Sequence, residues 1–303
     1  MKERWRNLDR RTLFSAAGLL LTAVCLAFVG YIVYRERDVL VAHLLRADAR
    51  LLLAVAAWYA VDLALVIVGW ASIMASLGGR LGLARHARIF CLANAAKRLP
   101  GTLWYVGGRA ALYSRAGISS RAVVVGSAVE GALTWLSGLV IAVPFLMVAM
   151  PERRWIWLGA GGLLLAGLLN PVTLRRILQR ATREGAGPAI SLAKIYSWLL
   201  LYVVVWVVGG VLLFAILAIF QAPALNLLPN VIGAWSVAGT ASMLTIFLPS
   251  GFGVTEVTIT ALLGRLASPG VAVLVALSAR VLITLLDVIA GSLAYVAEVV
   301  DRP

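Results

Sequence analysis

The sequence has very few of the side chains that carry catalysis or metal binding. Among its 303 residues there are two cysteines, Cys25 and Cys91, and two histidines, His43 and His86. Both cysteines fall in or beside apolar stretches, which indicates small buried side chains rather than a disulfide framework or a thiolate metal site. The two histidines lie far apart and lack ligand spacing, so we expect no metal site and no cofactor.

Charge is also scarce, since 13% of the residues are charged while 62% are hydrophobic. A chain of this length cannot hide so much apolar surface in one water-soluble core, so lipid must be its solvent. The charge that is present is unbalanced, with 27 lysine and arginine residues against 13 aspartate and glutamate residues. We attribute this excess to the membrane surface, and expect membrane lipids with anionic head groups, not nucleic acid, as partners.

Long hydrophobic runs predict an all-α, polytopic membrane protein. A bilayer core about 30 Å thick requires roughly 20 apolar residues per helix. The runs predict a bundle of about seven to eight transmembrane helices within a single transmembrane domain, residues 1–303. The stretches that meet or approach the required length are 13–34, 51–76, 122–150, 155–170, 195–220, 231–248 and 269–299. The first run lacks a small-residue cleavage pattern near its end, so we interpret it as a membrane anchor.

The distribution of basic residues predicts a cytoplasmic N-terminus. With that orientation most lysine and arginine residues fall in the segments assigned to the cytoplasm, which are 1–12, 77–121, 171–194 and 249–268. Few fall in the segments assigned to the outside, which are 35–50, 151–154 and 221–230. Seven crossings would leave the C-terminus outside, and an eighth would return it to the cytoplasm.

Two segments do not have the pattern of a simple span. Residues 81–121 contain an amphipathic stretch, a Pro100-Gly101 break and a glycine-rich stretch. Residues 249–266 contain a Pro-Ser-Gly break followed by a second, less charged amphipathic stretch. Both segments are predicted to be re-entrant or interfacial helices, in which a chain break dips into the membrane or lies along it.

These two segments predict an internal repeat. Arg115 precedes Glu130 by 15 residues, and Arg265 precedes Arg280 by the same interval. We place repeat one at about 81–150 and repeat two at about 231–299, each with a break, a short amphipathic helix and a long span. Many transporters build a central site from broken helices in repeats. The span count places both copies in the same orientation, whereas one miscounted crossing would make them inverted, so their relative orientation stays open.

Five ionisable residues lie in or against the apolar runs: Asp62, Glu130, Glu256, Arg280 and Asp287. Each costs about 2.5 to 3.5 kcal/mol at the centre of a membrane helix, so each should face another charge, water or a ligand. Arg280 and Asp287 are two helical turns apart, and each is expected to pair with another helix. Glu130 and Arg280 hold matching places in the two copies and are the ion pair that we predict, with either a structural or a functional role.

A basic group surrounds the first break and is chemically suited to bind phosphate. Its members are Lys97, Arg98, Arg109 and Arg115, and Asn94 shares the helical face of the first two. Glycine backbone can approach a phosphate closely, and guanidinium groups form bidentate hydrogen bonds to it. The alternative is that these residues only fix the topology and contact head groups without a specific site.

Several of these motifs together resemble the flippase-like family, also called the lysylphosphatidylglycerol synthase transmembrane-domain family. The motifs are Asn-Ala-Ala-Lys-Arg-Leu at 94–99, Pro100-Gly101, Gly-Gly-Arg at 107–109, Ser-Arg-Ala-Gly at 114–117 and Leu-Pro-Ser-Gly-Phe-Gly-Val-Thr-Glu at 248–256. The resemblance covers roughly residues 10 to 300, and implies a multi-pass protein of a bacterial cytoplasmic (inner) membrane. It implies movement of a lipid with a phosphate-bearing head, such as a phospholipid, an aminoacyl-phospholipid, a hopanoid or a polyprenyl-phosphate-linked glycolipid.

Two-domain relatives carry a soluble synthase domain after the membrane part, and this chain ends at Pro303. We therefore do not carry over the synthase activity, and expect a flippase or transporter rather than an enzyme. The resemblance and the charge pattern together predict these substrate-binding residues: Asn94, Lys97, Arg98, Arg109, Arg115, Glu130, Pro249, Gly251, Gly253, Glu256, Arg280 and Asp287.

Two other classes of function stay open. A membrane enzyme of lipid-linked sugar metabolism would use acidic residues such as Glu36 and Asp38, although they lie among arginines. A lipid phosphatase is disfavoured because Phe252 stands where the catalytic histidine after Pro-Ser-Gly would be. The third class is a scaffold that binds a lipid-modifying synthase without transporting anything. No ATP-binding P-loop motif occurs, so transport would be downhill or driven by protons, and the oligomeric state is left open.

Overall fold

The computed structural model describes residues 48–96, 102–170, 190–244 and 253–300, together with residues 34, 38 and 172. All regular elements in this part of the chain are helical. The α-helices are α2 (Ala49–Ser76), α3 (Leu83–Ala96), α4 (Thr102–Ser114), α5 (Ser120–Ala149), α6 (Arg154–Leu169), α8 (Leu192–Phe220), α9 (Leu228–Leu244), α10 (Val254–Leu263) and α11 (Pro269–Val300). Two 3-10 turns, η1 (Pro151–Arg153) and η2 (Leu225–Leu227), precede α6 and α9.

The protein is an all-α, multi-pass membrane protein, as its sequence predicts. Within the described residues, five helices are long and apolar enough to cross a bilayer: α2, α5, α8, the η2–α9 segment and α11. Their outer surfaces carry large apolar side chains that are more than half exposed, including Leu53, Leu200 and Leu293, which suits a lipid solvent. The predicted total of seven to eight spans remains a prediction. The run 13–34 lies almost wholly outside the described residues, and α6, with 16 residues, is about 24 Å long.

Local signals set where the long helices begin. The Asp48 carboxylate accepts a hydrogen bond from the backbone N–H of Arg50 at the start of α2. The Ser191 hydroxyl accepts one from the backbone N–H of Lys194 at the start of α8. Both residues satisfy backbone donors that a helix leaves free in its first turn. Pro269 begins α11, a position at which its missing N–H does no harm.

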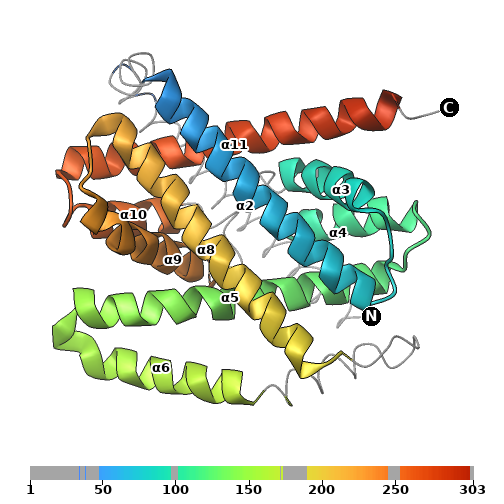
Figure 1. Ribbon diagram of the computed structural model, residues 1–303, viewed down its shortest axis with the longest axis horizontal. Helices are drawn as coiled ribbons and strands as arrows, with labels where there is room; N and C mark the ends of the chain where they lie inside the picture. The colour runs from blue at the N-terminus through green and yellow to red at the C-terminus, as the bar shows by residue number, and fades with distance from the viewer. Residues whose placement is uncertain are drawn as a thin grey trace, which may run out of the picture.

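The two long helices that follow the breaks run in opposite directions. Helix α2 ends and α5 begins on the same side of the molecule (Figure 1). The chain between them, which contains α3 and α4, therefore starts and finishes on that side. Helix α8 ends and α11 begins at the other end, and α9 and α10 return there in the same way (Figure 1). The span count placed both predicted copies in the same orientation and left their relative orientation open, and in the structure their long helices α5 and α11 run in opposite directions.

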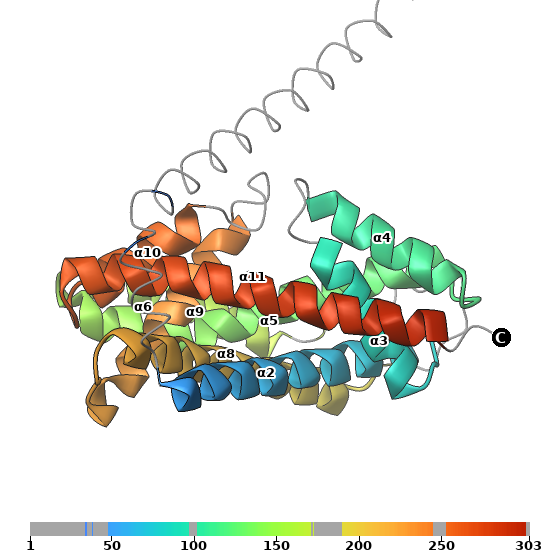
Figure 2. The ribbon, with the colours of Figure 1, turned by 90° about the horizontal axis from the view of Figure 1, so that it is seen from above.

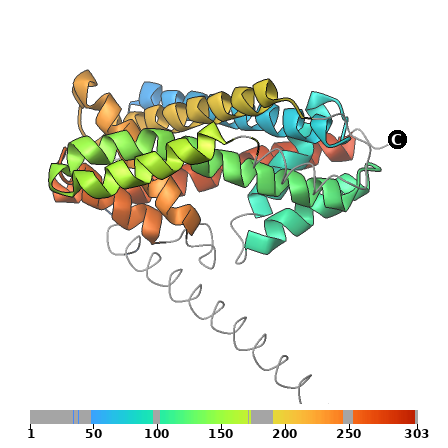
Figure 3. The same cartoon turned by 90° about the horizontal axis from the view of Figure 1, so that it is seen from below.

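The molecule is layered. Helices α2 and α8 lie side by side on one face, and α4 and α10 lie on the opposite face near opposite ends (Figure 2 and Figure 3). Between these layers, α3 packs against α11 and α9 packs against α5. We call α3–α4 and α9–α10 the two broken helix pairs. The first helix of each pair thus packs against the long helix that follows the other pair, so the α2–α5 part of the chain is joined to the α8–α11 part.

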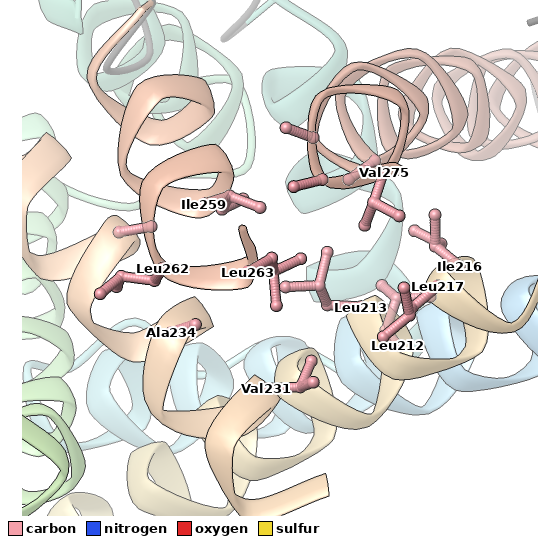
Figure 4. Close-up of a cluster of buried hydrophobic side chains, with 14 of the residues drawn as sticks. Leu212, Leu213, Ile216, Leu217, Val231, Ala234, Ile259, Leu262, Leu263 and Val275 are labelled. Carbon is pink, nitrogen blue, oxygen red and sulfur yellow. The ribbon is translucent and has the colours of Figure 1, made fainter. Parts of the chain in front are cut away.

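Two apolar clusters hold the short helices α10 and α4. Figure 4 shows Ile259, Leu262 and Leu263 of α10 packed against side chains of α8, α9 and α11. At the other end, Tyr113 of α4 packs in a cluster with Trp70 of α2 and with side chains of α3 and α5. Each short helix is therefore seated on long helices, and so are the charged residues that it carries.

Glycine allows α9 to approach its neighbours closely. A Cβ atom built on Gly239 of α9, or on Gly138 of α5, would overlap the ring of Trp206 of α8. Helix α4 is different, because a Cβ atom on Gly107 or Gly108 would meet no atom within 4 Å. Glycine is therefore a packing requirement where α9 meets α5 and α8, and has no such role in α4.

This contrast predicts opposite effects on stability for one chemical change. Gly239→Ala should lower the thermal midpoint, because overpacking typically costs about 1 to 3 kcal/mol. Gly107→Ala should leave the midpoint unchanged or raise it, because alanine favours a helix over glycine by up to about 1 kcal/mol. Thermal unfolding of the detergent-purified protein measures both. Equal destabilisation by the two substitutions would contradict the packing described here.

Candidate functional site

An ion pair joins α4 to α5 inside the bundle. Nη1 of Arg109 lies 2.6 Å from Oε2 of Glu130, and the side chains are 0% and 12% exposed, respectively. Glu130 is ten residues beyond Ser120, where α5 begins, which is about 15 Å along the helix. The pair thus lies well inside an apolar helix, where each charge needs the other.

Aromatic side chains enclose the guanidinium group of Arg109. Its Cζ atom lies 3.8 Å from the ring centre of Trp70, 4.4 Å from that of Tyr105 and 4.6 Å from that of Phe90. Nη2 of Arg109 also donates a hydrogen bond to the Tyr105 hydroxyl. Contacts of a desolvated cation with aromatic faces are worth about 2 kcal/mol or more. These rings hold the guanidinium plane in position and exclude solvent from it.

A hydrogen-bonded chain fixes the largest of these rings. Nε1 of Trp70 donates to the Tyr113 hydroxyl at 2.7 Å, and that hydroxyl lies 2.6 Å from Nδ1 of His86. All three side chains are almost fully buried. His86 therefore has a structural partner, and the ring beneath Arg109 is anchored by α3 and α4.

A second ion pair joins α10 to α11. Nε of Arg280 lies 2.6 Å from Oε1 of Glu256. Oε2 of Glu256 accepts a hydrogen bond of 2.8 Å from the backbone N–H of Gly253, just before α10 begins. A carboxylate is favoured at a helix N-terminus, where free N–H groups point outward. Gly253 has a φ of 85°, which favours glycine, so the glycine of the predicted motif has a conformational reason.

The predicted ion pair between Glu130 and Arg280 is wrong. Glu130 pairs with Arg109, and Arg280 pairs with Glu256. In the first pair the short helix supplies the cation, whereas in the second it supplies the anion. Sequence spacing shows that Glu130 and Arg280 hold matching positions, but α5 and α11 each receive their opposite charge from the short helix that precedes them.

A buried carboxylate connects the two parts of the chain. Asp287 of α11, which is 4% exposed, accepts a hydrogen bond of 2.7 Å from the Tyr59 hydroxyl of α2. It accepts another of 2.7 Å from the side-chain amide of Asn94 of α3. The prediction that Arg280 and Asp287 each contact another helix is confirmed, because their partners lie on α10, α2 and α3.

The predicted phosphate-binding group is not a single cluster in the described part of the chain. Arg109 is buried, whereas Arg115 lies just beyond the end of α4 and is exposed. Asn94 binds Asp287. The other four predicted site residues, Lys97, Arg98, Pro249 and Gly251, lie outside the described residues.

Sequence reasoning missed the aromatic part of this site. Tyr105, Trp70 and Phe90 surround Arg109, and the Tyr202 hydroxyl lies 3.5 Å from Oε1 of Glu130. For Trp70 and Tyr202, which lie inside predicted spans, the available signal is a polar ring atom that needs a partner in lipid. Tyr105 and Phe90 lie outside the predicted spans and carry no such signal. That signal does not say which charge each ring contacts.

The described residues include no group of three or more histidine, cysteine, aspartate or glutamate side chains that could hold a metal ion. The site brings together carboxylates, guanidinium groups and hydroxyls, which form charge-assisted hydrogen bonds with one another. No family model matches the sequence, and no curated protein matches it.

The Arg109–Glu130 pair predicts a strongly non-additive response to mutation. Glu130→Leu alone should destabilise the protein by about 3 to 5 kcal/mol, because it leaves a buried guanidinium without its counter-charge. The double substitution Arg109→Met with Glu130→Leu should recover a large part of that loss, since neither charge remains buried. A double-mutant cycle of unfolding free energies measures the coupling. Additive effects would mean that the two side chains do not interact in the membrane.

Proposed function

We propose that this chain translocates a lipid with an anionic or phosphate-bearing head between the leaflets of a membrane. The observation that carries the proposal is a set of buried charges on long apolar helices, namely Glu130 on α5 together with Arg280 and Asp287 on α11. Charged residues inside a bilayer are costly and typically mark the path of an ion or substrate.

Buried charges on long apolar helices suit the physical problem of lipid translocation. A polar head must cross about 30 Å of hydrocarbon while its acyl tails stay in lipid. Charged and hydroxyl groups between helices replace the water that the head group leaves. The two ion pairs belong to different broken helix pairs, α3–α4 and α9–α10, which enter from opposite ends of the molecule (Figure 1). A head group that moves from one end to the other therefore meets one pair after the other.

The opposite directions of α5 and α11 support an inverted repeat. Inverted repeats of broken helices are common in transporters, whose two halves take equivalent positions on the two sides of the membrane. We extend the predicted repeat to include the preceding long helices, so that α2–α5 corresponds to α8–α11. On this view α3–α4 and α9–α10 are re-entrant helix pairs rather than spans.

The membrane and the orientation are part of the proposal. The segment 77–121 is rich in basic residues and belongs to the end at which α3 and α4 lie. We assign that end to the cytoplasmic side of a bacterial inner membrane, in accordance with the preference of basic residues for that side. Because α11 ends there as well (Figure 1), the C-terminus is assigned to the cytoplasm too. Segment 249–268, which the sequence-based assignment placed in the cytoplasm, is therefore assigned to the outside.

The proposal is consistent with the resemblance to the flippase-like family, which would place a phospholipid, an aminoacyl-phospholipid or a polyprenyl-phosphate lipid among the substrates. With no ATP-binding motif in this chain, movement would be downhill or coupled to protons through a carboxylate such as Glu130 or Asp287. A synthase that makes the lipid would then be a natural partner.

Transport can be tested with the purified protein in liposomes that carry fluorescent phosphatidylglycerol or polyprenyl phosphate in one leaflet. Wild-type protein should accelerate exchange between leaflets. The double variant Glu256→Gln with Arg280→Gln should slow it about tenfold or more, because one charge-assisted interaction is worth about 1.5 to 3 kcal/mol. The double variant leaves no unpaired charge from this ion pair, so folding is preserved better than in a single variant.

Arg154→Gln is the matched control, because Arg154 begins α6 and is exposed. It should transport as the wild type does. Folded wild-type protein that accelerates none of these lipids would exclude them as substrates and favour a scaffold that binds a lipid-modifying synthase.

A further inference from the structure

One buried hydrogen-bond donor of the Arg109 side chain, Nε, has no acceptor among the described residues. Nη1 of Arg109 donates to Glu130, and Nη2 donates to Tyr105, but Nε has no hydrogen-bond partner among the described residues. Arg109 is 0% exposed. A buried donor without a partner is destabilising and is rare enough in native proteins to need a specific explanation.

The aromatic rings leave only the edge of the guanidinium group for a new contact. Trp70, Phe90 and Tyr105 lie within 5 Å of Cζ, so the faces of the plane are occupied. Nε–H points along that edge beside one N–H of Nη2, the amino group that also donates to the Tyr105 hydroxyl. This fork matches two oxygens of a phosphate or carboxylate and binds them with parallel hydrogen bonds.

We propose that Arg109 is an oxyanion-binding residue whose free Nε edge binds the substrate phosphate, and that Glu130 competes with the phosphate for the same guanidinium. The phosphate as ligand rests on the function proposed above, whereas the binding site rests on the contacts of Arg109. A phosphate that binds Arg109 supplies the negative charge that Glu130 supplies in the ion pair. When Glu130 returns, it expels the head group.

Glu130 has a second hydrogen-bond donor for the time it is displaced. Its other carboxylate oxygen, Oε1, lies 3.5 Å from the hydroxyl of Tyr202, on α8. A small rotation of the carboxylate toward α8 shortens this contact as the contact to α4 is lost. Glu130 thus alternates between a guanidinium and a hydroxyl, and is not left without a partner in lipid.

The experiment measures binding to the full-length protein in detergent, separately from transport. The probes are dihexanoyl-phosphatidylglycerol, inorganic phosphate and the uncharged dihexanoyl-glycerol, and titration calorimetry gives their affinities. Arg109→Lys keeps the charge but removes the fork, so it should weaken binding of dihexanoyl-phosphatidylglycerol about tenfold or more. Glu130→Gln removes the rival carboxylate and should strengthen binding of the same lipid.

Arg154→Lys is the control, because Arg154 also lies near an indole ring, that of Trp155 at 5.3 Å, but is exposed. It should bind as the wild type does. Opposite shifts for Arg109→Lys and Glu130→Gln cannot come from misfolding, which would weaken binding in both.

Unchanged binding in Arg109→Lys, or loss of binding in Glu130→Gln, would overturn the inference. Equal affinity of dihexanoyl-phosphatidylglycerol and dihexanoyl-glycerol would also overturn it. Inorganic phosphate that binds as tightly as the lipid, with the same response to Arg109→Lys, would support the oxyanion site but assign it to a soluble anion. If the wild type moves lipid between leaflets while Arg109→Lys binds normally, the proposed function stands and the inference fails.

Discussion

Neutralising charge inside an apolar bundle is the constraint on which the rest of this structure depends. An isolated guanidinium or carboxylate within a membrane helix is strongly unfavourable, so each such group on α5 and α11 must meet a partner. The short helices α4 and α10 supply those partners, Arg109 for Glu130 and Glu256 for Arg280. Helices α4 and α10, with 13 and 10 residues, each present a charge to the long helix that follows them.

The two helix pairs, α3–α4 and α9–α10, both pack against long helices and differ in a further kind of contact. Helix α9 approaches α5 and α8 so closely that Gly138 and Gly239 leave room only for the ring of Trp206. Helix α3 is connected to α11 and α2 through hydrogen bonds, in which Asn94 and Tyr59 meet at Asp287. Close backbone packing has few alternative arrangements, because any shift creates overlap or a void. Hydrogen bonds between polar side chains can exchange partners, so on the proposed function the side chains that change partner lie at the α3–α4 end.

Much of the architecture was predictable from sequence because it depends on local pattern. Apolar runs of sufficient length predict helices in lipid, and α2, α5, α8 and α11 follow their predicted ranges closely. The Pro-Gly and Pro-Ser-Gly motifs predicted interruptions, and separate helices lie on either side of each. The relative orientation of the two copies was left open, because hydrophobicity and length do not distinguish a crossing helix from the first arm of a pair that turns back. In the structure α5 and α11 run in opposite directions.

The sequence by itself determined the solvent, the helical class and the charges that lie in or against the apolar runs, because each depends on composition or on residues near one another in the chain. It did not single out Arg109 as a buried charge. Only the tertiary structure decided which charges meet. Glu130 and Arg280 are equivalent in spacing and opposite in sign, yet they do not pair with each other. Each pairs with an opposite charge on the short helix that precedes it, α4 or α10. The enclosure of Arg109 by Trp70 of α2, Phe90 of α3 and Tyr105 of α4 likewise depends on long-range packing, because no sequence period relates residues on separate helices.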